Sequence, residues 1–145
     1  MKVFYLGSTD ECLNKIKIKI KKNYSNVETD TFSPPFMDDF DDSTNKLILK
    51  KINDFKPDIL FIGMTAPKQE KWVYNHYKNI KCNIFCSIGA VFDFYSEKVP
   101  RAPKFFIALG LEWLYRSLLS RRLAKRNFSS NPKFIIDLLI SYFKK

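Results

Sequence analysis

Two kinds of hydrophobic pattern alternate along the first ninety residues. Short apolar runs bounded by turn residues predict β-strands at 3–6, 27–32, 59–62 and 83–88. Apolar residues at helical spacing predict helices at 12–22, from Ser43 or Thr44 to about Phe55, and at 69–77. Strands that alternate with helices are typical of a parallel sheet covered by helices. We therefore predict an α/β fold, a Rossmann-like open parallel sheet with helices on both faces.

Turn residues support these boundaries. The first strand ends in Gly7-Ser8-Thr9-Asp10, a turn followed by a helix cap, which favours a helix at 12–22 although isoleucines and lysines alternate there. Pro67 suits the first position of the helix that follows the third strand. The segment from Ser33 to Asp42 contains two prolines and four aspartates, and it predicts a loop.

The last 45 residues have no strand pattern. They predict two or three helices, at 103–119, 121–128 and 132–143. This segment holds ten of the 25 Lys and Arg residues but two of the 15 acidic ones. We predict a sheet-bearing portion at 1–100 and a basic helical appendage of the same domain at 101–145.

Composition indicates a globular protein that does not cross a membrane. A chain of 145 residues that is 46% hydrophobic and 16% aromatic can bury a real core, which excludes disorder and a disulfide miniprotein. Its longest apolar stretches, 105–115 and 134–143, are shorter than the ~20 residues that span a bilayer, so we expect no membrane crossing. Three cysteines and no apolar leader indicate free thiols in a reducing cytoplasm, and a single histidine does not favour a zinc site.

A net charge of +10 favours an anionic partner such as phosphate, nucleic acid or a membrane surface. Nucleic acid is the weakest of the three, because the sequence has no helix-turn-helix, zinc finger or aromatic RNA-binding strand motif. We expect no nucleic-acid partner. Charge alone does not choose between phosphate and membrane.

Two loops that follow predicted strands carry candidate chemistry. In open α/β sheets, ligands bind beyond the carboxyl ends of the strands, where helix N-termini attract phosphate. In the loop 63–70, Lys68 supplies a charge and Gln69 an amide donor and acceptor; in the loop 89–93, Asp93 supplies a carboxylate for sugar hydroxyls. Each loop can also be explained structurally, as an ordinary turn in which a glycine and a capping side chain stabilise the backbone. Asp39-Phe40-Asp41 matches a D-x-D metal motif, but solvent exposure explains four acids in a Pro-flanked loop more simply, so we expect no metal or cofactor.

Six sequence blocks together are far more specific than these patterns. They are SPPF at 33–36, PDILFIG at 57–63, APKQEKW at 66–72, GAVFD at 89–93, RAPK at 101–104 and GLEWLYR at 110–116. In their order and spacing, the chain from about Val3 onward resembles the WecG/TagA/CpsF glycosyltransferases.

The resemblance implies an inverting glycosyltransferase. Such an enzyme moves an N-acetylmannosamine-type sugar from a UDP-sugar to an undecaprenyl-diphosphate-linked acceptor, in the synthesis of cell-surface polysaccharide or teichoic acid. It implies a cytoplasmic protein, peripheral on the inner face of the bacterial plasma membrane. Residues 1–100 are then the nucleotide-sugar-binding portion, and residues 101–145 associate with the membrane.

The resemblance also assigns roles to residues. The UDP-sugar contacts it implies are Thr65, Lys68, Gln69 and Asp93. The residues it implies for the diphosphate and the membrane are Arg101, Arg116, Arg122 and Arg126. The sequence departs from the family pattern at Thr65, where glycine is usual, and at Ser120-Arg121, where Glu-Pro is usual. The catalytic residues are unknown, because the family's general base belongs to an N-terminal half that no part of this chain matches.

Two functions from different classes follow. The first is a glycosyltransferase, or a truncated part of one, completed by a separate N-terminal half and inactive alone; a homo-oligomer is the other partner we expect. The second is a non-catalytic, membrane-associated module that binds nucleotide sugars or a partner enzyme. Turnover assays and ligand titrations separate the two.

Overall fold

The chain divides into two compact units, Met1–Val99 and Pro100–Lys145. The computed structural model describes residues 1–97, 102–119, 124 and 140. The helices predicted at 121–128 and 132–143 therefore lie outside the described residues, apart from residues 124 and 140. That the second unit is an appendage of the same domain stays a prediction. Each unit is considered by itself.

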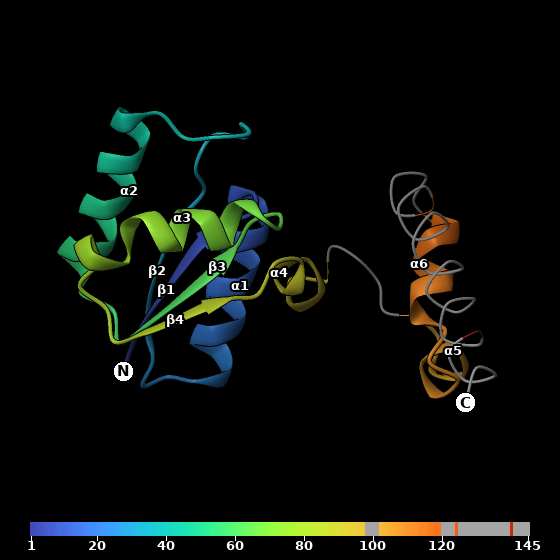
Figure 1. The fold of residues 1–145 in the computed structure, drawn as a ribbon. Coiled ribbons are helices and arrows are strands. Elements are labelled where there is room, and N and C mark those ends of the chain that lie inside the picture. The colour runs from blue at the N-terminus through green and yellow to red at the C-terminus, as the bar shows by residue number, and fades with distance from the viewer. Residues whose placement is uncertain (98–101, 120–123, 125–139, 141–145) are drawn as a thin grey trace. The chain divides into compact units, whose positions relative to one another are not determined.

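A four-stranded parallel sheet forms the centre of the first unit (Figure 1). Its strands are β1 (Lys2–Gly7), β2 (Glu28–Phe32), β3 (Ile59–Gly63) and β4 (Ile84–Ser87), in the order β2-β1-β3-β4. The chain adds β2 on one side of β1 and then β3 and β4 on the other. This reversal places a topological switch point between β1 and β3, where α/β proteins bind ligands at the carboxyl edge.

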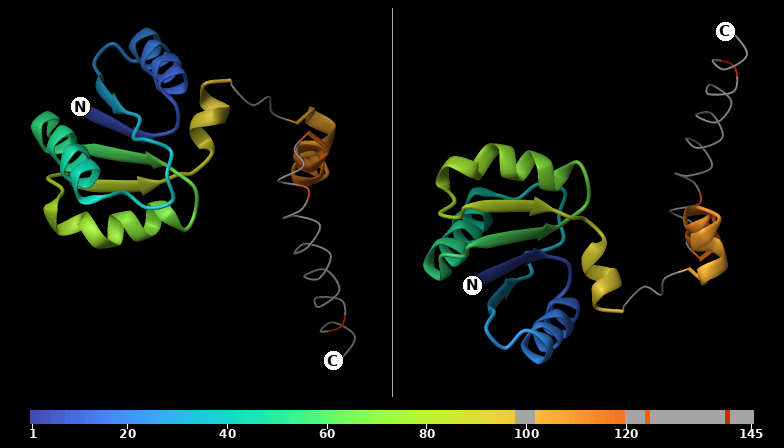
Figure 2. Two further views of the ribbon diagram at one scale, coloured as in Figure 1. Left: turned by 90° about the horizontal axis from the view of Figure 1, so that it is seen from above. Right: turned by 90° about the horizontal axis from the view of Figure 1, so that it is seen from below.

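Helices cover both faces of the sheet (Figure 2). They are α1 (Asp10–Asn23), α2 (Asp42–Phe55), α3 (Lys68–His76) and α4 (Val91–Tyr95), and the 3-10 turn η1 (Tyr77–Asn79) continues α3. Helices α2 and α3 pack on one face, and α1 and α4 on the other. The predicted α/β, Rossmann-like parallel sheet with helices on both faces is confirmed.

The central strand β1 is buried on both sides. Phe4 and Leu6 point into the cluster beneath α2 and α3, and Val3 and Tyr5 point into the cluster beneath α1 and α4. All four are at most 8% exposed. A strand buried on both faces reads as a continuous apolar run, which is why the sequence identified it. The cysteines are free, as predicted, and Cys12 is buried in the second cluster.

Helix starts were predicted less well than strands. Thr9 caps α1 as expected, with its Oγ1 accepting from the Cys12 N–H at 3.4 Å. Helix α2 is capped by Asp41, however, and not by Ser43 or Thr44: Oδ1 of Asp41 accepts from the Thr44 N–H at 2.8 Å. Hydrogen bonds from Thr44 and then Ser43 lower the pKa of Asp41. Pro67 is the N-cap of α3 and not its first helical residue.

The second unit contains two short helices where the sequence predicted one at 103–119. They are α5 (Lys104–Ala108) and α6 (Glu112–Leu119), and Gly110 between them has φ +69°, a left-handed conformation that ends a helix. Phe105, Leu118 and Leu119 are 60 to 71% exposed. Within the described residues, no helix reaches the length and apolarity that crossing a bilayer requires.

Candidate functional site

The loops after β1, β2 and β3 meet at the carboxyl edge of the sheet, beside the switch point. The Ser8 N–H donates to the Gly63 carbonyl at 3.2 Å. The Ser33 hydroxyl donates to the Ser8 carbonyl at 2.8 Å. The β2–α2 loop, residues 33–41, is therefore tied to the two central strands at its start.

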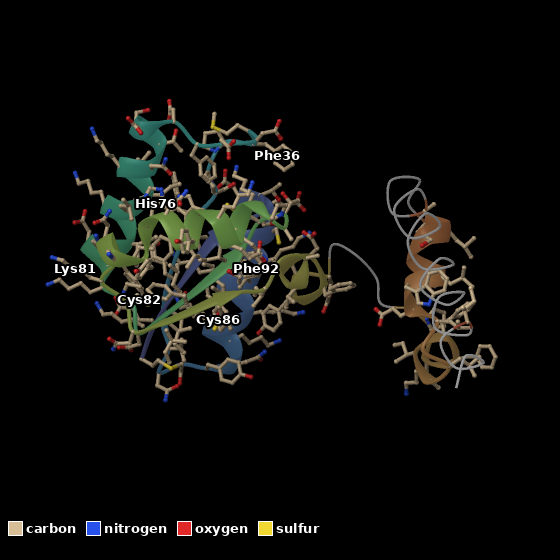
Figure 3. All side chains as sticks on the ribbon, viewed as in Figure 1. Phe36, His76, Lys81, Cys82, Cys86 and Phe92 are labelled. Atoms are coloured by element: carbon tan, nitrogen blue, oxygen red, sulfur yellow. The ribbon has the colours of Figure 1, made fainter. Side chains whose placement is uncertain are left out.

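Two glycines allow the backbones at this edge to approach closely. A Cβ on Gly7, which has φ +112°, would lie 2.6 Å from the Gly63 carbonyl oxygen. A Cβ on Gly63 would lie 2.2 Å from the ring of Phe92 in α4. Phe92 lies at the carboxyl end of the sheet, where β4 leads into α4 (Figure 3). The backbone of Gly7 and Gly63 therefore forms the base of the candidate site, and Gly63 packs directly against Phe92 of α4.

Gln69 joins the loops that follow β3 and β4. Its side chain is 4% exposed, and its Oε1 accepts from the N–H of Met64 at 3.3 Å and of Gly89 at 3.1 Å. Its Nε2 donates to Oε1 of Glu70 at 2.8 Å. The side-chain oxygen thus satisfies two backbone donors from different βα units, a role that the sequence did not predict.

Lys68 is directed toward the β2–α2 loop. Its Nζ donates to the Met37 carbonyl at 2.6 Å and lies 3.5 Å from the centroid of the Phe40 ring. Burial lowers the pKa of Lys68, and the charges of Asp39 and Asp38 oppose that shift. The ammonium is thus already engaged by protein groups.

Thr65 and Asp93 lie in the two loops that Gln69 connects. Thr65 is exposed, and its carbonyl accepts from the Gln69 N–H at 3.3 Å. Asp93 is partly buried in α4, and within the described residues its carboxylate makes no hydrogen bond or ion pair. The Gln69 to Gly89 bond brings these loops together, so Thr65, Gln69 and Asp93 share one edge of the sheet. A carboxylate without a protein partner is available to accept from ligand hydroxyls.

A second connection between α3 and the β2–α2 loop runs through Asn45 and could not be predicted from the sequence. Nε1 of Trp72 donates to Oδ1 of Asn45 at 2.9 Å, and Nδ2 of Asn45 donates to the Phe40 carbonyl at 3.1 Å. Asn45 lies in the first turn of α2, and nothing in its local sequence marks it as special. The APKQEKW block thus contacts three loops through Lys68, Gln69 and Trp72.

The other candidates are less defined. Arg101, Arg122 and Arg126 lie outside the described residues, and so does the side chain of Arg116, which belongs to α6. Their roles stay predictions. Of the D-x-D motif, Asp41 is used as the cap of α2. Among the described residues, no cluster of three or more His, Cys, Asp or Glu side chains is arranged to hold a metal.

Comparisons with known proteins identify the family of the chain. The model of the glycosyl transferase WecG/TagA/CpsF family matches residues 1–145. Relatives from Staphylococcus aureus strains NCTC 8325 / PS 47 and MRSA252 are each 31% identical over 118 residues, and both are named N-acetylglucosaminyldiphosphoundecaprenol N-acetyl-beta-D-mannosaminyltransferase. Each match covers 81% of this chain and 44% of the relative, so the chain spans less than half the length of these proteins. The resemblance of the six blocks is thereby confirmed, and the chain belongs to the WecG/TagA/CpsF family of glycosyl transferases.

Proposed function

We propose that this chain forms the donor-binding part of an inverting glycosyltransferase. The reaction moves an N-acetylmannosamine-type sugar from a UDP-sugar to an undecaprenyl-diphosphate-linked acceptor, in the synthesis of teichoic acid or cell-surface polysaccharide. Family membership and the names of the relatives support the reaction class. The chain's own geometry supports the donor-binding part.

One observation carries the donor site: an uncapped helix start shares the carboxyl edge with Asp93, whose carboxylate has no partner among the described residues. Thr9 and Asp41 cap α1 and α2, whereas α3 begins without a side-chain cap. The Gln69 N–H already donates to the Thr65 carbonyl, so the N–H groups of Lys68 and Glu70, together with the positive end of α3, suit the diphosphate. Asp93 accepts from hydroxyls of the ribose or sugar, and the exposed Thr65 belongs to the loop before α3. Gln69 holds the β3–α3 and β4–α4 loops together through its side-chain oxygen.

The second unit is proposed to hold the acceptor end of the reaction at the membrane. Arg101, Arg116, Arg122 and Arg126 supply guanidinium groups for the departing diphosphate, which an inverting transfer must stabilise. Each basic residue near an anionic surface adds about 1 kcal/mol of attraction. Exposed Phe105, Leu118 and Leu119 on α5 and α6 suit the same interface. The location is then the inner face of the plasma membrane, from the cytoplasmic side.

The general base is proposed to come from outside this chain, in a separate N-terminal half or a second copy. Alone, the chain is expected to bind the donor and to transfer no sugar.

Calorimetric titration of the full chain with UDP, UDP-N-acetylmannosamine and ADP tests the donor site. We expect the uridine ligands to bind more tightly than ADP, and Asp93→Asn to weaken them about tenfold, because a charge-assisted hydrogen bond contributes about 1.5 kcal/mol or more. Asp54→Asn is the matched control, since Asp54 is an exposed aspartate in the last turn of α2, far along that helix from the carboxyl edge. Unchanged affinity in Asp93→Asn would remove the proposed ribose or sugar contact.

A turnover assay separates the two functions. UDP-N-acetylmannosamine is incubated with a short-chain lipid-diphosphate N-acetylglucosamine, with the chain alone and with the N-terminal half of a relative added. Transfer by the completed pair supports the enzyme. Donor binding and flotation with anionic liposomes, without transfer by either sample, favour the non-catalytic module.

A further inference from the structure

Two side chains of α3 hold the β2–α2 loop. Lys68 and Trp72 are one helical turn apart and therefore share a face of the helix. Lys68 contacts the loop directly, through the Met37 carbonyl and the Phe40 ring. Trp72 contacts it through Asn45, which donates to the Phe40 carbonyl. Phe40 is thus held on both its ring and its carbonyl.

The rest of this loop contributes little to its own position. Phe36, the residue before Met37, is 98% exposed, and Met37 is 40% exposed. Figure 3 labels Phe36 on this loop, above α3 in that view. The loop therefore lacks an apolar anchor at its tip. It is attached by Ser33 at its start, by the contacts of Met37 and Phe40 with Lys68, and by the packing of Phe40 on the hydrophobic cluster beneath α2 and α3.

The surroundings of the Lys68 ammonium oppose a direct contact with phosphate. One of its protons is donated to a carbonyl, and an aromatic face lies 3.5 Å away. Burial lowers the pKa of Lys68, and the negative charges of Asp39 and Asp38 oppose that shift; the same charges would repel a phosphate at this place. The ammonium is therefore supplied with a carbonyl, an aromatic face and two carboxylates by the loop itself.

We propose that Lys68 is a positioning residue, which fixes the β2–α2 loop beside the donor site through Met37 and Phe40 and does not contact the diphosphate. The proposal rests on the proposed function, because it concerns the border of the same site. It changes the role that the family resemblance implied for this lysine. The proposal also gives a role to Trp72, one helical turn after Lys68. Through Asn45, Trp72 holds the carbonyl of Phe40, whereas Lys68 contacts its ring.

The two roles predict different ligand profiles for Lys68→Met. A positioning residue affects whatever the loop borders, so uridine and UDP should lose affinity by a similar factor of about three to ten. A diphosphate contact affects UDP alone. Affinities for uridine and for UDP are both measured by NMR titration, because this method reaches dissociation constants in the millimolar range. A loss for UDP at least tenfold greater than the loss for uridine overturns the proposal.

Hydrogen exchange of the amides at 36–41 tests the clamp without any ligand. Lys68→Met and Phe40→Leu should each speed exchange in this segment at least fivefold, and the double variant should add little to either, because both remove one contact. Lys68→Arg should restore slow exchange, since a guanidinium also donates to a carbonyl and stacks on a ring. Lys71→Met is the matched control: Lys71 is exposed on the same helix, and it should change nothing.

The ligand titrations test the donor site, and the hydrogen-exchange measurements test the contacts of Lys68 with the β2–α2 loop. If the unmodified chain binds neither uridine nor UDP, the donor site fails, and the exchange data still decide the clamp. If exchange at 36–41 is unchanged in both Lys68→Met and Phe40→Leu, the clamp fails, whatever the chain binds. Circular dichroism of each variant verifies the fold, and Phe40→Leu provides the loop-side test if Lys68→Met does not fold.

Discussion

Adding one methyl group at Gly63 should disrupt the contact between the sheet and α4. The new Cβ would lie 2.2 Å from Cδ2 and 2.5 Å from Cε2 of Phe92, where ordinary contacts are 3.4–4 Å. The Phe92 ring is 2% exposed and lies edge-on to Tyr5 at 5.7 Å between centroids, so it has little room to move. Overpacking of this kind costs about 1–3 kcal/mol, and an overlap of more than 1 Å on a buried ring indicates the upper part of that range.

The same substitution should weaken donor binding. Phe92 immediately precedes Asp93 in α4. A displaced ring moves the short helix and with it the carboxylate. We expect Gly63→Ala to lower UDP affinity even under conditions in which the variant remains folded.

Urea unfolding in a Trp113→Phe background measures the cost. The chain has one tryptophan in each unit, so Trp72 fluorescence then reports on the first unit. Gly63→Ala should lower the midpoint with an unchanged m value. Phe92→Leu makes room for the methyl group, so it should cost less in the Gly63→Ala background than in the parent. A Gly63→Ala variant within about 0.5 kcal/mol of the parent, or full additivity of the two changes, would refute the packing argument.

Three further predictions concern single side chains. Burial raises the pKa of Tyr5 to about 12; the unfolded phenol ionises first, near pH 10, so Tyr5 should lower the stability between about pH 10 and 12, and Tyr5→Phe should make the fall in alkaline unfolding curves shallower. The lowered pKa of Asp41 stabilises α2 above the ordinary aspartate pKa, and this contribution should disappear as the pH falls through the lowered value. Asp41→Asn should keep the cap but flatten the acid limb of thermal unfolding against pH, and an unchanged limb would contradict the capping role. Gln69→Leu leaves the Met64 and Gly89 amides without their acceptor, so it should cost about 1–3 kcal/mol and speed exchange of those two amides, whereas protected amides would contradict the bridge.

The strands could be predicted from the sequence because burial on both faces requires apolar residues at successive positions. The run at 59–62 is an example: Leu60 and Ile62 pack under α2 and α3, and Phe61 packs on the opposite face. Helix starts were harder, because several residues near each start can serve as caps. Asp41 was read as part of an exposed acidic loop, and only the fold shows that its carboxylate receives the N–H of Thr44.

The loops could be predicted from the sequence, but not the contacts between them. Strand ends and turn residues identified the loops around Thr65 and Asp93. Lys68 contacts a carbonyl 31 residues away in the chain, and Gln69 accepts from an N–H 20 residues away, and no local pattern encodes such distances. The partly buried N–H groups of Met64 and Gly89 need an acceptor, and the buried Gln69 supplies it.

The bridge made by Gln69 has a thermodynamic consequence. Because a single oxygen atom accepts from two βα connections, removing it frees the N–H groups of both connections at once. For the donor site proposed above, the order of both loops therefore depends on one amide side chain as well as on the groups proposed to touch the sugar.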